Sequence, residues 1–186
     1  MNFVSESASL SVPNISTSRL ELVAITPEAV LSEQAGDGRL GEILGGRITN
    51  EWPLEDWEPH VLVWLLNRFA EDPKSIGWCR YVLLREEDTL PVLIGTVGAL
   101  HPQREPRESE IGYGIVPEFR LRGYALEATR AMIGWAEASG EVDRLISHTY
   151  PELLGSIRIL ERCGFVLEGP GNEARTIRYG RKVTSP

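Results

Sequence analysis

One stretch of the chain constrains the fold more than any other: a strand that Pro117 ends, a short turn rich in arginine and glycine, and a helix that begins at about Gly123. The unpaired N–H groups at a helix N-terminus carry partial positive charge and attract anions. Gly123 lets the backbone approach a ligand closely, and Ala125 keeps the next helical position small. Arg120 and Arg122 flank the turn. These features predict a pyrophosphate-binding turn, and an ordinary strand–helix turn with two solvated arginines is the alternative.

The hydrophobic pattern around this stretch predicts a mixed α/β fold. Runs rich in β-forming residues at 76–86, 91–101 and 108–116 are separated by polar turns, which indicates two antiparallel hairpins. Helical spacing of apolar residues predicts helices at 53–72, 123–139 and 155–163, and Thr26-Pro27 is typical of a helix start. A short helix is expected within 36–46, and further strands are expected at 19–25, 142–150, 165–168 and 173–181.

The length of 186 residues fits one domain. Residues 1–16 are polar and rich in serine, and they are expected to form a flexible lead-in. No linker divides the rest of the chain, so residues 17–184 are expected to form a single domain.

Composition excludes several classes of function. The net charge of −8 argues against a nucleic-acid partner, which usually meets a basic face. Two cysteines and three scattered histidines predict neither a disulfide framework nor a metal site. No apolar run reaches the length of a membrane span, and the first twenty residues do not look like a signal peptide. We therefore expect no membrane partner and a cytoplasmic location.

A second informative stretch, Tyr150 to Phe165, follows the strand expected at 142–150. The residues of this stretch that form a recognisable pattern are Ser156, Arg158, Leu160, Glu161, Arg162, Gly164 and Phe165. Together with the Glu-Ile-Gly-Tyr at 110–113 and the turn at 120–125, it resembles the GNAT superfamily of acetyl-CoA-dependent N-acetyltransferases. Within that superfamily it looks most like the branch that acetylates the N-termini of ribosomal proteins. The opening residues 17–22 also resemble the first strand of that branch, so the resemblance covers about residues 17–181.

The resemblance implies a single-domain GNAT-like fold, with a mixed, mostly antiparallel sheet splayed at the cofactor site and flanked by helices. It implies acetyl-CoA as co-substrate and no metal. The pantetheine arm of the cofactor would pair with the backbone of residues 114–116, and Gly112 and Gly114 suit a bulge that splays this strand from 142–150. The implied cofactor-binding residues are Gly114, Ile115, Val116, Arg120, Arg122, Gly123, Tyr124, Ala125 and Ser156.

Transfer to an amine needs a base, because an α-amine has an ordinary pKa of about 8 and a lysine one of about 10.4. Glu110 is the first candidate, acting directly or through a water, and Glu108 is the alternate. The alternative for Glu110 is a strand carboxylate that pairs with an arginine. The resemblance places the Ser156 hydroxyl near the thioester sulfur as a proton donor, although the same hydroxyl would also suit a helix N-cap. Tyr150 is the second donor candidate.

One residue departs from the family pattern. The family reads Pro-x-Asn-x-x-Ser, where the asparagine orders the helix start and contacts the pantetheine arm, and this chain has Leu153 at that position. Leucine offers no side-chain hydrogen bond. The resemblance implies acetyl transfer from acetyl-CoA to a primary amine, either a protein N-terminus or a small molecule. A non-catalytic CoA-binding sensor or scaffold is the alternative that Leu153 motivates, and a homodimer stays open because edge strands permit one.

Overall fold

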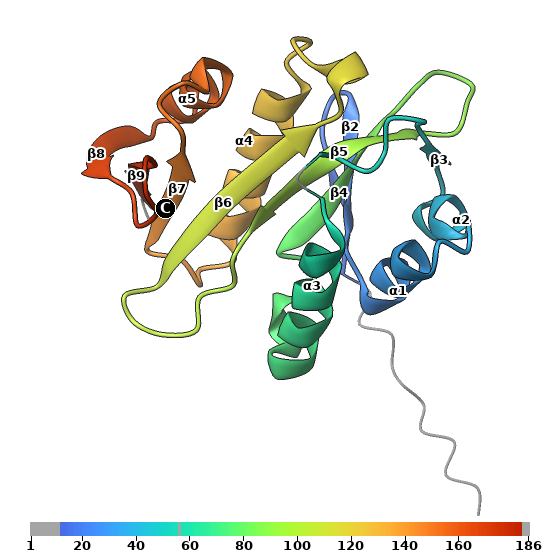
Figure 1. Cartoon of the computed structure of the whole chain (residues 1–186), viewed down its shortest axis with the longest axis horizontal. Helices are drawn as coiled ribbons and strands as arrows, with labels where there is room; N and C mark the ends of the chain where they lie inside the picture. The colour runs from blue at the N-terminus through green and yellow to red at the C-terminus, as the bar shows by residue number, and fades with distance from the viewer. Residues whose placement is uncertain (1–11, 56, 184–186) are drawn as a thin grey trace, which may run out of the picture.

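The computed structural model describes residues 12–55 and 57–183, which form one nine-stranded sheet with helices on both faces (Figure 1). The strands are β1 (Ile15–Ser16), β2 (Leu20–Ala24), β3 (Arg47–Ile48), β4 (Cys79–Leu84), β5 (Val92–Ala99), β6 (Glu108–Ile115), β7 (Arg144–Thr149), β8 (Val166–Pro170) and β9 (Ile177–Lys182). The α-helices are α1 (Pro27–Ala35), α2 (Leu40–Leu44), α3 (Pro59–Glu71), α4 (Tyr124–Ala138) and α5 (Leu154–Arg162), and the 3₁₀ turns are η1 (Pro73–Ser75) and η2 (Pro117–Phe119).

The sheet consists of two antiparallel halves joined by one parallel pair. Its strand order is β1-β2-β4-β5-β6-β7-β9-β8, with β3 beside β5. Every neighbouring pair along this order is antiparallel except β6 and β7. The predicted hairpins β4–β5 and β5–β6 are present. The predicted mixed, mostly antiparallel sheet with flanking helices is therefore confirmed.

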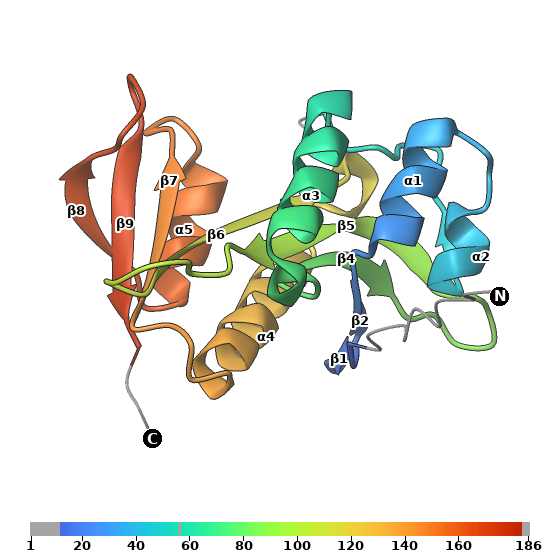
Figure 2. The ribbon, with the colours of Figure 1, turned by 90° about the horizontal axis from the view of Figure 1, so that it is seen from below.

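The helices lie on opposite faces of the sheet (Figure 2). Two clusters of buried apolar side chains hold them there. Leu62, Leu65 and Phe69 of α3 pack with the apolar residues of α1 and α2 over one face of β4 and β5. Met132 of α4 and Leu160 of α5 belong to the cluster on the other face. Side chains of successive strand residues point to opposite faces, so neighbouring residues of one strand meet different clusters.

The sequence signals for helix starts predict α1 correctly but not the start of α3. Thr26 is the N-cap of α1, and its hydroxyl accepts a hydrogen bond from the N–H of Ala29. The helix predicted at 53–72 is wrong at its start, because α3 begins at Pro59. Proline suits the first turn of a helix and disfavours helical geometry in the residue before it, so the helix cannot extend back through Glu58.

The structure departs from two further predictions, the flexible lead-in at residues 1–16 and the bulge in β6. Residues 1–11 of the lead-in and residue 184 of the expected domain lie outside the described residues, while Ile15–Ser16 pairs with β2. The bulge in β6 is not present: β6 pairs with β5 in unbroken register from Ile111 to Ile115. The splay between β6 and β7 arises instead because their pairing stops.

Candidate active site

The strands β6 and β7 separate part of the way along β6. They pair in parallel from Glu108↔Arg144 to Glu110↔Ile146, and no pair is formed beyond that point within the described residues. On its other edge, β6 stays paired with β5 as far as Ile115. The result is a fork between β6 and β7 that opens in the middle of the sheet.

The register shows which backbone groups face this fork. Antiparallel neighbours bond through alternate residues. The carbonyl of Glu110 accepts a hydrogen bond from the N–H of Leu100, and the N–H of Val116 donates to Ile94 on the same side. Gly114 belongs to this set bonded to β5. The residues in between turn their backbone groups toward β7 and the fork: Ile111, Tyr113 and Ile115. Because Glu110 pairs with Ile146, the N–H of Ile111 belongs to the last bridge to β7, and the groups that face the open fork begin at the C=O of Ile111. Of the expected pairing segment 114–116, only Ile115 faces the fork, and its carbonyl already accepts from the guanidinium of Arg120 at 2.8 Å.

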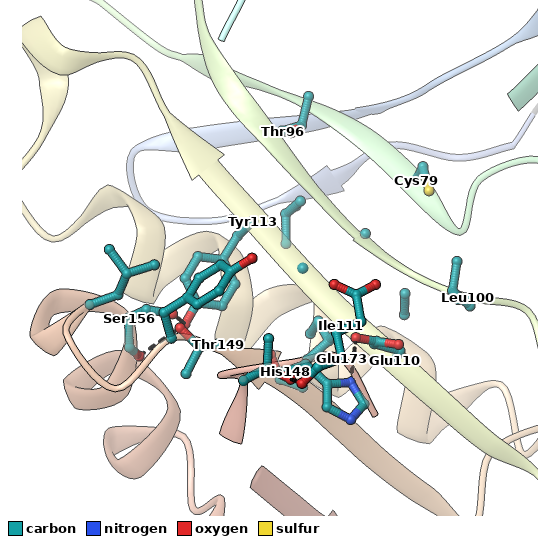
Figure 3. Close-up of a pocket in the computed structure, with 18 of the residues that line it drawn as sticks. Cys79, Thr96, Leu100, Glu110, Ile111, Tyr113, His148, Thr149, Ser156 and Glu173 are labelled. Carbon is teal, nitrogen blue, oxygen red and sulfur yellow. Dashed lines mark hydrogen bonds and ion pairs between the residues drawn. The ribbon is translucent and has the colours of Figure 1, made fainter. Parts of the chain in front are cut away.

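A cavity of about 580 Å³ lies at the fork, between the end of β5, the middle of β6, the end of β7 and the loop before β9 (Figure 3). Its carboxylates are Glu110 and Glu173, and no lysine or arginine lines it in the part of the chain that the structure describes. Gly112 lines it on the same face as Glu110, and a Cβ there would meet nothing within 4 Å. The space beside the Glu110 carboxylate is therefore open.

Glu110 is paired with a histidine and not with an arginine. Its Oε1 lies 2.8 Å from Nδ1 of His148, and Figure 3 shows this contact. The side chain of Glu110 is 37% exposed, while that of His148 is 10% exposed. Glu108, the alternate base, does not line this cavity and lies 2.5 Å from Arg178. Of the two carboxylates, Glu110 has the access that a base needs.

The Ser156 hydroxyl, one of the candidate proton donors, is bonded to a tyrosine on the other face of β6 from Glu110. Tyr113 alternates with Glu110 and packs against the cluster that contains α4. Its hydroxyl lies 3.2 Å from Oγ of Ser156 and donates to the carbonyl of Ser156 at 3.1 Å. Burial raises the pKa of Tyr113 to about 12. A group bound in the fork would thus have a carboxylate on one side and a pair of hydroxyls on the other.

The N-cap of α5 is not the residue that the sequence suggests. Ser156 is not an N-cap, because it lies inside the first turn of α5. The N-cap is Leu153, which makes no side-chain capping hydrogen bond and is 50% exposed at the cavity. Tyr150 also lines the cavity and is 41% exposed.

The predicted pyrophosphate turn lies beyond the end of β6, apart from the cavity lining (Figure 1). Gly123 is the N-cap of α4 with φ of 82°, a left-handed conformation that glycine adopts without strain. It provides no capping side chain, so the first N–H groups of α4 are open to a ligand. Leu121 also has a positive φ of 62° and is fully exposed, which is unusual for a large apolar residue. Arg122 is exposed and its guanidinium lies over the ring of Phe119.

Residues 17–19, in the turn between β1 and β2, hold the pyrophosphate turn in place. Arg19 lies over the ring of Tyr124, donates to the carbonyl of Arg122 at 3.0 Å and pairs with Glu127. Glu127 also accepts hydrogen bonds from Thr17 and from the N–H of Arg19. Burial alone would raise the pKa of Glu127, but these hydrogen bonds outweigh it and lower the pKa to about 2.

The wall of the cavity next to α3 rests on a half-buried carboxylate. Glu33 of α1 accepts hydrogen bonds from the indoles of Trp52 and Trp57 at 2.7 and 3.0 Å, and from the hydroxyl of Tyr81 at 2.7 Å. Burial raises the pKa of Glu33, and these three hydrogen bonds oppose that rise. Trp57 lines the cavity, so this arrangement fixes its indole there.

Three residues of the site are not among those that the sequence predicts. His148 is one of three scattered histidines, yet it lies in the strand next to that of Glu110. Tyr113 belongs to the Glu-Ile-Gly-Tyr motif without a role of its own there. Arg19 lies in the segment that resembles a first strand, and its contact with Glu127 joins residues 108 positions apart. A register for β6 and β7 would have identified the first of these.

Within residues 12–55 and 57–183, no group of three or more histidine, cysteine, aspartate or glutamate side chains is arranged to hold a metal ion. No helix in that part of the chain is long and apolar enough to cross a membrane.

Comparison with known proteins gives a consistent result. Residues 19–166 match the acetyltransferase (GNAT) domain. The chain is 25% identical over 168 residues to the uncharacterized N-acetyltransferase YjdG of Bacillus subtilis (strain 168), covering 90% of this chain and 98% of that protein. An acetyltransferase from Agrobacterium tumefaciens str. C58 is 25% identical with a TM-score of 0.60, covering 95% and 98% of the two chains.

Two solved structures of ribosomal-protein acetyltransferases share the fold at lower identity. RimL, a ribosomal L7/L12 α-N-protein acetyltransferase in complex with coenzyme A, is 16% identical with a TM-score of 0.65, covering 94% of this chain and all (100%) of the other. The ribosomal-protein-S5-alanine acetyltransferase from Vibrio fischeri is 17% identical with a TM-score of 0.61, covering 92% and 97% of the two chains.

Proposed function

The chain belongs to the GNAT acetyltransferase family, and on that premise we propose that it transfers the acetyl group of acetyl-CoA to the primary amine of a protein N-terminus or of a small molecule. The observation that carries this proposal is the fork between β6 and β7, which opens onto a cavity beside the exposed carboxylate of Glu110. The fold shared with RimL and with the S5-alanine acetyltransferase supports a protein N-terminus among the acceptors.

The residues at the fork and turn fit acetyl-CoA. The open N–H groups of α4, the left-handed Gly123 and the exposed Arg120 and Arg122 suit a pyrophosphate. The fork-facing C=O of Ile111 and the N–H and C=O of Tyr113 suit an extended arm that carries amides. When bound, acetyl-CoA supplies the activated acyl thioester.

The side chains at the fork supply the proton transfers. Glu110 takes a proton from the acceptor ammonium, which makes the nitrogen a nucleophile. The absence of lysine and arginine from the cavity lining favours a cationic acceptor. The Ser156 hydroxyl, linked to Tyr113, lies across the strand from Glu110 and donates a proton to the departing thiolate. Tyr150 is the second donor candidate at the cavity.

The test is release of free CoA from acetyl-CoA with a panel of peptides and small primary amines. We expect release that depends on the acceptor, together with mass spectrometry of a product heavier by one acetyl group. Tight CoA binding without release for any amine would contradict the proposal and favour the non-catalytic CoA-binding module. ADP that competes with acetyl-CoA as strongly as CoA does would indicate a site for the nucleotide alone.

A further inference from the structure

Glu110, the proposed base at the fork, has a hydrogen-bond partner, His148, that is not part of the sequence motifs shared with the family. On β7, His148 lies two residues beyond Ile146, which pairs with Glu110, so the two side chains share one face of the sheet. Glu110↔Ile146 is the last pair before the fork opens. The 2.8 Å contact between His148 Nδ1 and Glu110 Oε1 therefore lies at the base of the fork (Figure 3).

The neighbouring cations do not serve Glu110. Arg178, which pairs with His148 in the β7–β9 register, bonds to Glu108 and Glu168. Arg144 also pairs with these two carboxylates. Within the described residues, His148 is thus the only side chain that bonds to the carboxylate of Glu110.

The imidazole is fixed from behind. The side chain of His148 is about nine-tenths buried, and its Nε2 is buried with no hydrogen-bond partner among the described residues. The loop before β9 covers the ring, since a Cβ at Gly171 would lie 3.0 Å from its Cδ2. A carboxylate accepts hydrogen bonds only, so the ring presents Nδ1–H to Glu110. One oxygen of Glu110 is therefore held, and the other remains for the cavity.

From this geometry we infer that His148 is a positioning residue for acetyl transfer, which holds Glu110 so that its free oxygen meets the acceptor ammonium. The inference rests on the proposed function. The proton of the ammonium goes to the free oxygen of Glu110, and His148 keeps its own Nδ1 proton throughout. A misplaced catalytic group of this kind costs rate and not cofactor affinity.

The experiment compares two variants of His148 with the wild-type chain. His148→Leu removes the donor to Glu110, and we expect kcat to fall roughly 10- to 100-fold with the KM for acetyl-CoA unchanged. His148→Asn keeps an N–H donor near the position of Nδ1 and should recover most of the lost kcat. His60→Leu, on an exposed histidine at the start of α3, is the matched control and should leave both constants unchanged.

Melting curves establish that each variant is folded. Unchanged kcat in folded His148→Leu would overturn the inference while the proposed function stands. A kcat for His148→Asn as low as that for His148→Leu would also overturn it, because the donor alone would then not suffice. If the wild-type chain released no CoA with any amine, the proposed function would fail and this inference would fail with it.

Discussion

Glu110 carries the clearest prediction at the scale of single residues. Glu110→Gln keeps the size of the side chain but removes the proton acceptor, so we expect kcat at neutral pH to fall roughly 10²- to 10⁴-fold. The deficit should shrink at high pH, where the acceptor amine is already neutral. Rates measured from about pH 6 to 10, around the ordinary pKa of amines, check this.

The control for Glu110 is a residue of the same type nearby. Glu108→Gln disturbs the ion pairs with Arg144 and Arg178. It should lower the melting temperature and leave kcat nearly unchanged. Parallel pH–rate profiles for wild type and Glu110→Gln would move the role of base away from Glu110. Ser156→Ala tests the donor in the same assay, and normal turnover in a folded variant would exclude its hydroxyl as the acid.

At the scale of elements, the start of α4 carries the prediction about the cofactor. Gly123→Val places a β-branched residue at φ of 82°, with its Cβ 3.4 Å from the guanidinium of Arg19. We expect CoA binding to weaken by well over tenfold, as measured by calorimetry, because the backbone turn must change. Gly134→Ala is the control, since that exposed helical position has open space around it. Wild-type affinity in folded Gly123→Val would exclude this turn as the pyrophosphate site.

The start of α5 carries a second prediction at this scale. Leu153 occupies the N-cap without a capping hydrogen bond, so Leu153→Asn should stabilise the protein by about 1 kcal/mol in urea unfolding. The same amide restores the group that the family pattern has there, and we expect CoA to bind more tightly. Leu154→Asn, one residue inside the helix, should give neither effect. A neutral Leu153→Asn would mean that the site has adapted to leucine.

At the scale of the whole molecule, the contacts between the β1–β2 turn and Glu127 of α4 predict how stability depends on pH. The pKa of Glu127 is lowered from an ordinary 4.5 to about 2, so the unfolded chain binds its proton first as pH falls. The stabilisation of up to roughly 3 kcal/mol is present above pH 4.5 and is lost as pH falls toward 2. Urea unfolding of wild type and Glu127→Gln should differ at pH 7 and converge in acid. A constant difference across that range would contradict the prediction.

Helices and turns that a few adjacent residues define could be predicted from the sequence. Contacts that depend on the register between strands could not. Thr26 predicted the start of α1, and Gly123 predicted the turn before α4, because caps and turns depend on a few adjacent residues. The contact between Glu110 and His148 depends on how two strands align across a helix and a loop, which the alternation within each strand does not specify. The start of α3 was missed because the apolar spacing continues upstream of Pro59, while the indoles of that segment donate to Glu33.

The fork has a mechanical consequence. Within the sheet, three residue pairs of β6 and β7 connect the two halves. An extended ligand arm bonded to Ile111 and Tyr113 would act as an extra strand there and tie the halves together. Hydrogen–deuterium exchange should therefore slow at the Tyr113 amide when CoA is added, and hardly change with ADP, which has no such arm. Saturating CoA at 100 times its Kd would add about 2.7 kcal/mol to the free energy of unfolding, so the cofactor would serve as a removable brace of the fold.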